Sequence, residues 1–236
     1  MPPARPQPAQ HAPPVQRLRV RYAKRGRARF TSHRDFGRAF ERALRRAGVP
    51  MAYSSGFSPH PRISYANASP TGAASEAEYL EIALVEHCDP DRVRAALDAA
   101  LPDGLDVLTV VEAGGGPLAD RLTGSLWTVD LPGADPAALD AAIADLLARN
   151  DVTVERMTRT GLRTFGVRRA VAALTRDGSV LSMVLHHQTP LVRPDDVLNA
   201  LCRLHPELAA ETPSVFRREC QGPLDPETLA IGDPLR

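Results

Sequence analysis

The stretch RLRVRYAKRG, residues 17–26, alternates three apolar side chains, Leu18, Val20 and Tyr22, with arginines. Side chains of a β-strand point alternately to opposite faces, so a period of two predicts a strand with one buried face and one face in water. The sequence therefore begins its ordered part with a strand that carries positive charge on its solvent side.

A helical pattern follows in residues 31–48, TSHRDFGRAFERALRRAG, where apolar residues recur at intervals of three and four. Ser32 can cap the first turn together with Asp35, and Gly48 followed by Pro50 marks the end. Arginines occupy the opposite side of the same pattern. We expect an amphipathic helix with its apolar side against the strand.

The remaining segments continue this succession of strands and helices and form two similar halves. In the first half, strands are predicted at RISYA (62–66), AEYLEIALVE (77–86) and GLDVLTVVEA (104–113), with a helix at DPDRVRAALDAAL (89–101). In the second half, strands are predicted at 125–132, 152–159, 180–187 and 214–220, with helices at 135–150 and 193–204. The long segment 158–178 is interpreted as an inserted loop followed by an extra strand. The fold class is α+β, with two tandem ferredoxin-like (βαββαβ) halves and antiparallel sheets.

These patterns divide the chain into five parts. We expect a disordered, proline-rich arm at residues 1–16, a ferredoxin-like half with a basic face at 17–113, a glycine-rich linker at 114–124, a second ferredoxin-like half at 125–220 and a loosely held tail at 221–236.

Composition excludes several classes of protein. With 236 residues, 43% of them hydrophobic and 24% charged, the chain has the composition of a globular protein, and it has neither a transmembrane-length apolar run nor a secretory signal. Its three cysteines are too scattered for a disulfide framework, and no ligand spacing supports a metal site. We therefore expect a cytoplasmic location, no metal, no cofactor and no membrane partner.

Charge is distributed unevenly along the chain. Between Arg17 and Arg62 there are thirteen Lys or Arg residues against two acidic ones, whereas from Ile63 onward there are fifteen basic and twenty-six acidic residues. The interpretation as a merely solvating surface does not explain this segregation of sign, because a compositional bias towards arginine would act on both parts. The basic segment predicts a polyanionic partner, with nucleic acid first among the candidates.

Two features of the basic segment are suited to such a partner. Four arginines, at positions 34, 38, 42 and 45, have the spacing of a single stripe on the predicted helix. The loop YSSGFSPHPRIS, residues 53–64, holds His60 between two prolines, which predicts a stiff backbone. Phe57 in this loop is a candidate stacking platform for a base, and Arg62 a candidate ligand for phosphate. The predicted nucleic-acid-binding residues are Arg27, Arg29, Ser32, His33, Arg34, Arg38, Arg42, Arg45, Ser54, Gly56, Phe57, His60 and Arg62.

Each loop residue also has a structural alternative. Phe57 could pack into the core under the loop, and Gly56 could serve only to shape a bend. The sequence does not tell whether the loops at the two ends of helix 32–47 form one site. His186 and His187 point to opposite faces if they lie on a strand, and they are interpreted as surface and edge residues.

The chain resembles the radical-SAM-linked protein family over about residues 17–220. The resemblance is carried by the run from Arg19 to Ile82, above all by GFSPHPRIS (56–64), and by residues 168–201. Members of that family occur beside, or fused to, a radical S-adenosylmethionine enzyme, and their own activity is not established. Since this chain lacks the cysteine cluster of such an enzyme, the resemblance implies a radical S-adenosylmethionine enzyme on a separate chain as partner.

Three functions remain open at this point. The first is an accessory module that binds RNA and presents it to the partner enzyme. The second is an RNA-modifying or RNA-processing enzyme in which His33 or His60 acts as general acid–base. The third is a protein-docking scaffold that uses the acidic second half.

Overall fold

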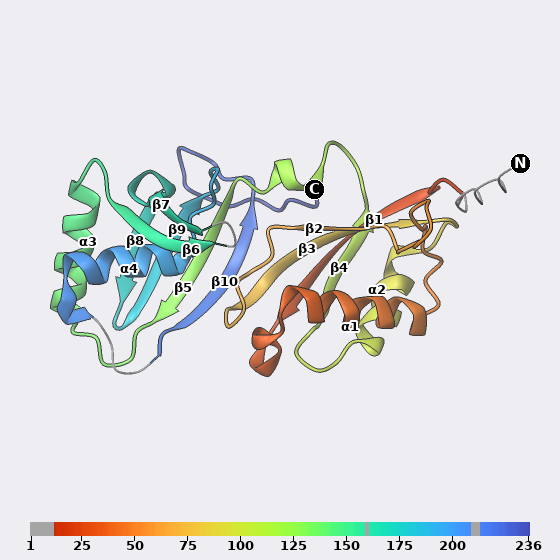
Figure 1. The fold of residues 1–236 in the computed structure, drawn as a ribbon, viewed down its shortest axis with the longest axis horizontal. Helices are drawn as coiled ribbons and strands as arrows, with labels where there is room; N and C mark the ends of the chain where they lie inside the picture. Colours follow the sequence, from red (N-terminus) through yellow and green to blue (C-terminus); the bar gives the residue numbers. More distant parts are fainter. Residues whose placement is uncertain (1–11, 159–160, 209–212) are drawn as a thin grey trace, which may run out of the picture. The chain divides into compact units, whose positions relative to one another are not determined.

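The computed structural model describes residues 12–158, 161–208 and 213–236, so most of the expected proline-rich arm lies outside the described residues. In these ranges the chain forms a mixed α+β fold with four α-helices, a mostly antiparallel eight-stranded sheet and a separate two-stranded sheet (Figure 1). None of the helices in the described ranges is long and apolar enough to cross a membrane.

The chain separates into two compact units. The first contains the described residues up to Thr71 together with Glu78–Leu118, and the second contains Gly72–Ala77 together with the described residues of Ala119–Pro234. One long strand, β3 (Ala74–Leu84), therefore contributes its first four residues to the second unit and the rest to the first.

The first unit has the strand order β4-β1-β3-β2. Its elements are β1 (Gln16–Lys24), the 3₁₀ helix η1 (Gly26–Phe30), α1 (His33–Arg46), β2 (Ile63–Ala66), the larger part of β3, α2 (Pro90–Ala100) and β4 (Val107–Glu112). Side chains of α1 and α2 share one core with the apolar side chains of β1 and β3, so both helices pack on the same face of the sheet.

Local sequence explains why α1 begins and ends where it does. The Ser32 side chain accepts a hydrogen bond from the backbone N–H of Asp35 at 3.1 Å, which satisfies a donor that has no partner within the helix. Gly48 follows the last turn with φ of +66°, a conformation that costs glycine little and other residues more. The predicted helix is therefore confirmed, with ends that differ by one residue.

Strand β1 departs from its prediction on one face. Leu18, Val20 and Tyr22 are buried as expected, but Arg19 on the opposite face is only 2% exposed. Its guanidinium lies 3.4 Å from Glu81 on β3 and donates a hydrogen bond of 2.6 Å to the carbonyl of Gly116. The chain that follows β4 covers this side of the strand, a long-range contact that alternation along β1 does not reveal.

The second unit has the strand order β10-β5-β9-β8. Its elements are β5 (Gly124–Asp130), α3 (Pro136–Ala148), β6 (Thr153–Thr158), β7 (Gly161–Gly166), η3 (Arg168–Ala170), β8 (Val171–Asp177), β9 (Val180–His186), α4 (Pro194–Leu204), η4 (Pro206–Leu208) and β10 (Val215–Gly222). β10 also pairs in parallel with the start of β3, at Ala74 and Ser75.

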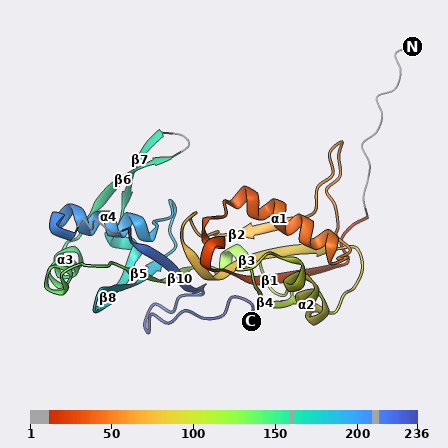
Figure 2. The same cartoon turned by 90° about the horizontal axis from the view of Figure 1, so that it is seen from below.

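The sequence interpretation of residues 152–178 is wrong in one respect. The strand predicted at 152–159 does not join the sheet of the second unit. It forms β6 and pairs antiparallel with β7, while β8 takes the place beside β9. Figure 2 shows the β6–β7 hairpin standing away from the sheet. Alternation identifies β6 as a strand, but it does not identify the strand with which β6 pairs.

The linker and the tail are more ordered than predicted. The linker at 114–124 contains the short helix η2 (Leu118–Arg121). In the tail, Leu224 donates from its backbone N–H to the Thr123 hydroxyl at 2.8 Å, and Gly232 donates to the carbonyl of Pro223 at 2.8 Å. Leu224 is 9% exposed, so the tail packs against the second unit rather than being loosely held.

Candidate nucleic-acid interface

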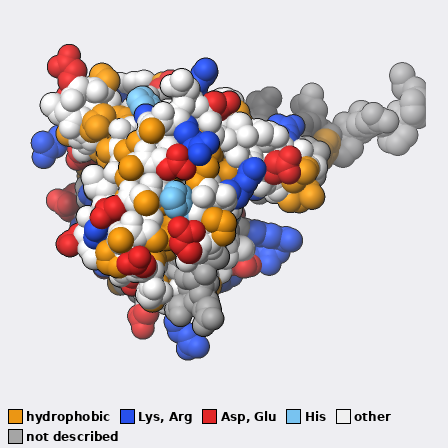
Figure 3. All heavy atoms as spheres, turned by 90° about the vertical axis from the view of Figure 1, so that its left-hand side faces the viewer, with side chains coloured by type: hydrophobic (Ala, Val, Ile, Leu, Met, Phe, Trp, Pro, Cys, Tyr) orange, Lys and Arg blue, Asp and Glu red, His pale blue; other side chains and the backbone are white. Residues whose placement is uncertain are grey.

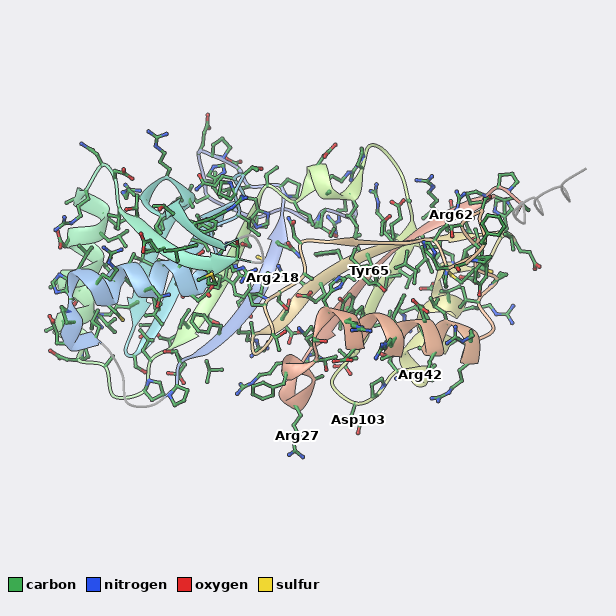
Figure 4. All side chains as sticks on the ribbon, viewed as in Figure 1. Arg27, Arg42, Arg62, Tyr65, Asp103 and Arg218 are labelled. Carbon is green, nitrogen blue, oxygen red and sulfur yellow. The ribbon has the colours of Figure 1, made fainter. Side chains whose placement is uncertain are left out.

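The outer face of α1 carries a continuous stripe of exposed arginines. Their side chains point away from the core that Phe36, Phe40 and Leu44 form with the sheet, and Figure 4 shows one of them, Arg42, projecting from the helix. None of the four forms an ion pair or a side-chain hydrogen bond with any residue that the structure describes. We call this set the arginine stripe; its members are Arg34, Arg38, Arg42 and Arg45.

Arginines of the second unit have different surroundings. The Arg149 side chain donates two hydrogen bonds to Asp145, at 3.0 and 3.1 Å, and Arg176 donates two to Asp140. These hydrogen bonds hold the pKa of Asp140 and of Asp145 below the usual range of a carboxyl group. Figure 3 faces the end of this unit that carries α3 and α4, and there acidic and basic side chains are interspersed. Among the residues that the structure describes, the arginine stripe has no such acidic partners.

The short helix η1 places two further basic residues just before α1. Arg27 is exposed and extends away from the protein in Figure 4. The Arg29 guanidinium lies 4.7 Å from the ring centroid of Phe30, a cation–π contact. Its buried Nε has no hydrogen-bond partner among the described residues. Phe30 itself is 59% exposed, and the sequence interpretation did not include it.

His33 lies in the first turn of α1 and contacts a residue that the sequence interpretation also missed. Its ring meets the edge of the Tyr65 ring on β2, with a centroid distance of 4.7 Å. The pKa of Tyr65 rises to about 12, first because the phenol is buried and second because Glu41 is near, so the hydroxyl keeps its proton at neutral pH. A Cβ at position 37 would lie 3.4 Å from this hydroxyl, which is an ordinary van der Waals contact, so α1 passes close to the phenol.

The segment between α1 and β2 is a braced hairpin. Ser54 donates from its backbone N–H to the carbonyl of His60 at 2.9 Å, and Arg62 donates to the carbonyl of Ala52 at 2.8 Å. The Ser54 hydroxyl also lies 3.1 Å from Nδ1 of His60 and accepts a bond from the His60 backbone N–H. These contacts fix the backbone on both sides of the tip, which is the rigidity that the prolines predict.

The tip of this hairpin is open to solvent. Phe57 is 76% exposed, so the structural alternative that it packs into the core is wrong. Gly56 has φ of +134°, in a region that side-chain-bearing residues rarely adopt, although a Cβ there would meet no neighbour. The glycine is thus required by the turn and not by packing.

Arg62 and His60 belong to a different face from the arginine stripe. Ile63 pairs with Ile82 and packs against the helix-side core, so Arg62 points to the opposite side of the sheet. There it lines a hollow of about 320 Å³ with Arg17, His60 and Glu81. Its Nε donates to the carbonyl of Tyr53 at 3.2 Å.

The two ends of α1 do not form one site. The hairpin that carries His60 lies at the C-terminal end of α1, as both ribbon views show (Figures 1 and 2), whereas Ser32 and His33 lie at its N-terminal end. A helix of 14 residues is about 20 Å long. His33 and His60 are consequently too far apart to act on the same atom, although residues at both ends can contact one elongated ligand.

His187 is another residue that the sequence interpretation placed wrongly. It lies just beyond β9 and is half-buried, with Nδ1 2.7 Å from the carbonyl of Leu122 and Nε2 3.0 Å from the Ser125 hydroxyl. Trp127 donates to the same hydroxyl at 2.9 Å. Burial is the main cause that lowers the pKa of His187, which favours its neutral form.

The described ranges contain no group of three or more His, Cys, Asp or Glu side chains arranged to hold a metal ion. None of the three cysteines forms a disulfide, and burial raises the pKa of Cys88 and of Cys202. A thiol with a raised pKa is a weaker nucleophile at neutral pH, because the thiolate is the reactive form.

Comparison with known proteins gives one family. The family model described as an uncharacterized protein conserved in bacteria (DUF2344) matches residues 17–194. None of the curated proteins compared with the chain matches it. A crystal structure of an unknown protein from Galdieria sulphuraria is 17% identical over 86% of this chain and 97% of that chain, with a TM-score of 0.27. A similarity at this level does not establish a shared fold or function.

Proposed function

We propose that this chain, which belongs to the family of uncharacterized proteins conserved in bacteria (DUF2344), binds RNA through the arginine stripe of α1. One observation carries the proposal: four neighbouring arginines are exposed on one helix face and form no ion pair with a described residue. Neighbouring guanidinium groups repel one another, and this repulsion gives the isolated protein no benefit. A polyphosphate relieves the repulsion, because it supplies negative charge next to the arginines.

The geometry favours contact with a phosphate backbone. A guanidinium presents donors that can bind phosphate oxygens in pairs, and successive arginines follow the helix at intervals of one turn. Arg27 and Arg29 extend the positive surface beyond the N-terminal end of α1. Because α1 packs along one side against the sheet, it offers only its outer face to a ligand. It is therefore suited to following a backbone rather than to entering a groove.

We also infer that each unit is a ferredoxin-like repeat and that the chain presents RNA to a radical S-adenosylmethionine enzyme on a separate chain. The strand orders β4-β1-β3-β2 and β10-β5-β9-β8 support the first inference, since in each the strand after the second helix lies beside the first strand. The second inference rests on the sequence resemblance described above.

The salt dependence of RNA affinity tests the proposal. Binding releases counterions, so the affinity of the unmodified protein should fall steeply between about 50 and 200 mM salt. The double variant Arg38→Ala/Arg42→Ala should bind more weakly and should lose about one unit of log–log slope per phosphate contact removed. Fluorescence anisotropy with a labelled RNA measures both quantities.

A matched control removes the same charge from the second unit. Arg163 and Arg169 are exposed there, and Arg163→Ala/Arg169→Ala should leave both the affinity and the slope close to those of the unmodified protein. Equal losses in the two double variants would mean that net charge, and not the arginine stripe, determines binding. Affinity that does not respond to salt would refute a phosphate contact altogether.

A further inference from the structure

Two exposed phenylalanines belong to the same unit as the arginine stripe. The large hydrophobic side chains exposed in the described ranges are Val15, Phe30, Phe57, Met157 and Leu162. Phe30 and Phe57 are the aromatic members of this set, and both belong to the first unit. An aromatic ring that stays in water does not gain the free energy of burial. Because both exposed rings belong to the basic unit, we expect them to contact an apolar group that is part of a polyanion.

The two rings belong to segments at the two ends of α1. Phe30 ends η1, three positions before His33, the first residue of α1, and Phe57 belongs to the hairpin between α1 and β2, which lies at the other end of the helix (Figures 1 and 2). The helix that carries the arginine stripe thus runs between the two segments that carry the exposed rings. Alternation of cationic side chains with aromatic platforms is typical of surfaces that bind single strands.

The Phe30 ring and the backbone that carries Phe57 are both restrained, which lowers the entropic cost of stacking a base there. The guanidinium of Arg29 is 4.7 Å from the Phe30 ring centroid and restrains that ring, while more than half of the side chain remains exposed. The tip that carries Phe57 is braced by the hydrogen bonds between Ser54 and His60. Preorganised groups lose less conformational entropy on binding than mobile ones.

We propose that the first unit is a track for single-stranded RNA, in which the arginine stripe binds successive phosphates while one base stacks on Phe30 and another on Phe57. This inference rests on the proposed RNA-binding function and specifies its substrate class. Duplex RNA does not fit the arrangement, because its bases are already stacked on one another and their faces are not accessible to the two rings.

The length of α1 gives the expected length of a stacked strand. The helix of 14 residues spans about 20 Å, and stacked nucleotides advance about 3.4 Å each. A strand that keeps this spacing has about six nucleotides along the helix. OB-fold domains that bind single strands occupy roughly 4–16 nucleotides each, so the expected site is of ordinary size.

The experiment measures the affinity of the full chain for fluorescent RNAs of about four, eight and twelve nucleotides, and for a blunt duplex of twelve base pairs. We expect affinity to rise strongly from four to eight nucleotides and little from eight to twelve, and we expect the duplex to bind more weakly than the strand of equal length. The affinity for a single-stranded DNA of the same sequence shows whether the 2′-hydroxyl contributes to binding. Equal affinity for strand and duplex, or a steady rise with length, would overturn the inference.

Substitutions of the two phenylalanines test whether their rings are responsible for the affinity for single strands. Phe30→Ala and Phe57→Ala should each weaken binding of the eight-nucleotide strand by about tenfold to a hundredfold without changing the salt slope. Phe30→Trp and Phe57→Trp should retain the affinity, because they keep a ring face. Met157→Ala removes an exposed aliphatic side chain of the second unit and should have no effect.

The outcomes separate this inference from the proposed function. If the arginine variants flatten the salt dependence but the phenylalanine variants bind like the unmodified protein, RNA binding by α1 stands and the single-strand track is refuted. Absence of any RNA binding would refute both. Loss of affinity in the alanine variants together with its retention in the tryptophan variants is the result that supports the track.

Discussion

Phe40 and Phe57 lie in the same unit and differ completely in their surroundings. Phe40 is fully buried under α1, whereas Phe57 is 76% exposed at the hairpin tip. We expect Phe40→Ala to lower the free energy of unfolding by about 3–5 kcal/mol, because it removes buried apolar contacts and leaves a cavity. Phe57→Ala should change it by less than about 0.5 kcal/mol.

Chemical denaturation followed by circular dichroism measures both values. A loss of several kcal/mol for Phe57→Ala would mean that this ring has a packing role that its exposure does not reveal. It would also remove the basis for using Phe57→Ala as a binding variant.

The contrast between Phe40 and Phe57 shows which side-chain environments can be predicted from the sequence and which cannot. Phe40 has helical periodicity around it, so its burial could be predicted. Phe57 stands in a loop without periodicity, and the sequence left both a core role and an exposed role open. Phe30 was missed altogether, because a phenylalanine that precedes a helix cap more often packs against the helix than points into solvent. Only the tertiary structure decides such cases.

His187 gives a prediction about pH. Burial lowers its folded-state pKa below the usual value of about 6.5, so between these two values the unfolded chain binds a proton that the folded chain does not. His187 therefore makes its full contribution to the free energy of unfolding above about pH 6.5, and this contribution falls as the pH decreases through that value. Thermal unfolding between about pH 7.5 and 5.5 should show a decline that His187→Gln reduces.

His87 supplies the control for this measurement. It is exposed in the segment between β3 and α2, and His87→Gln should leave the decline unchanged. A variant at position 187 that keeps the full pH dependence of the unmodified protein would show that the proton is taken up elsewhere.

At the scale of the element, helices were easier to predict than strand partners. All four helices lie where capping residues and apolar spacing place them, since these signals are local. The hairpin formed by β6 and β7 could not be predicted in this way, because the choice between neighbouring strands depends on contacts distant in sequence. The same reason explains the tail, whose residues have a polar, proline-containing composition and nevertheless pack against β5.

A glycine at the start of β5 tests how firmly the tail is held. A Cβ added at Gly124 would lie 2.7 Å from Cβ of Leu224, closer than unbonded atoms approach. Gly124→Ala should therefore lower the free energy of unfolding by about 1–3 kcal/mol. The measurement is again chemical denaturation.

Gly166 in β7 is the matched control, since the nearest atom to a Cβ there is 3.9 Å away. Gly166→Ala should cost little or even stabilise the strand. If Gly124→Ala were equally harmless, the tail would be able to move aside, and the prediction of a loosely held tail would be restored.

At the scale of the whole molecule, ion pairs occur in both units but leave out the arginine stripe. In the first unit, Arg17 and Arg19 pair with Glu81, and Arg25 pairs with Asp106. Acidic residues of the second unit neutralise Arg149, Arg156 and Arg176. The arginine stripe of the first unit is left without acidic partners among the described residues. Counting charges along the chain was enough to predict that the basic segment differs from the rest. It could not predict that Arg62 would point to another face than the stripe, because that depends on the register of β2 with β3.

The division of β3 between the two units has a consequence for biosynthesis. Residues 72–77 are translated more than forty positions before Ala119, where the remainder of their unit begins. On the ribosome the first unit can complete its own strands and helices while this segment still awaits β10, which is translated after every other strand of its unit. The second unit is therefore not encoded by one continuous part of the gene. A messenger that began at Ala119 would yield a protein without residues 72–77, of which Ala74 and Ser75 pair with β10.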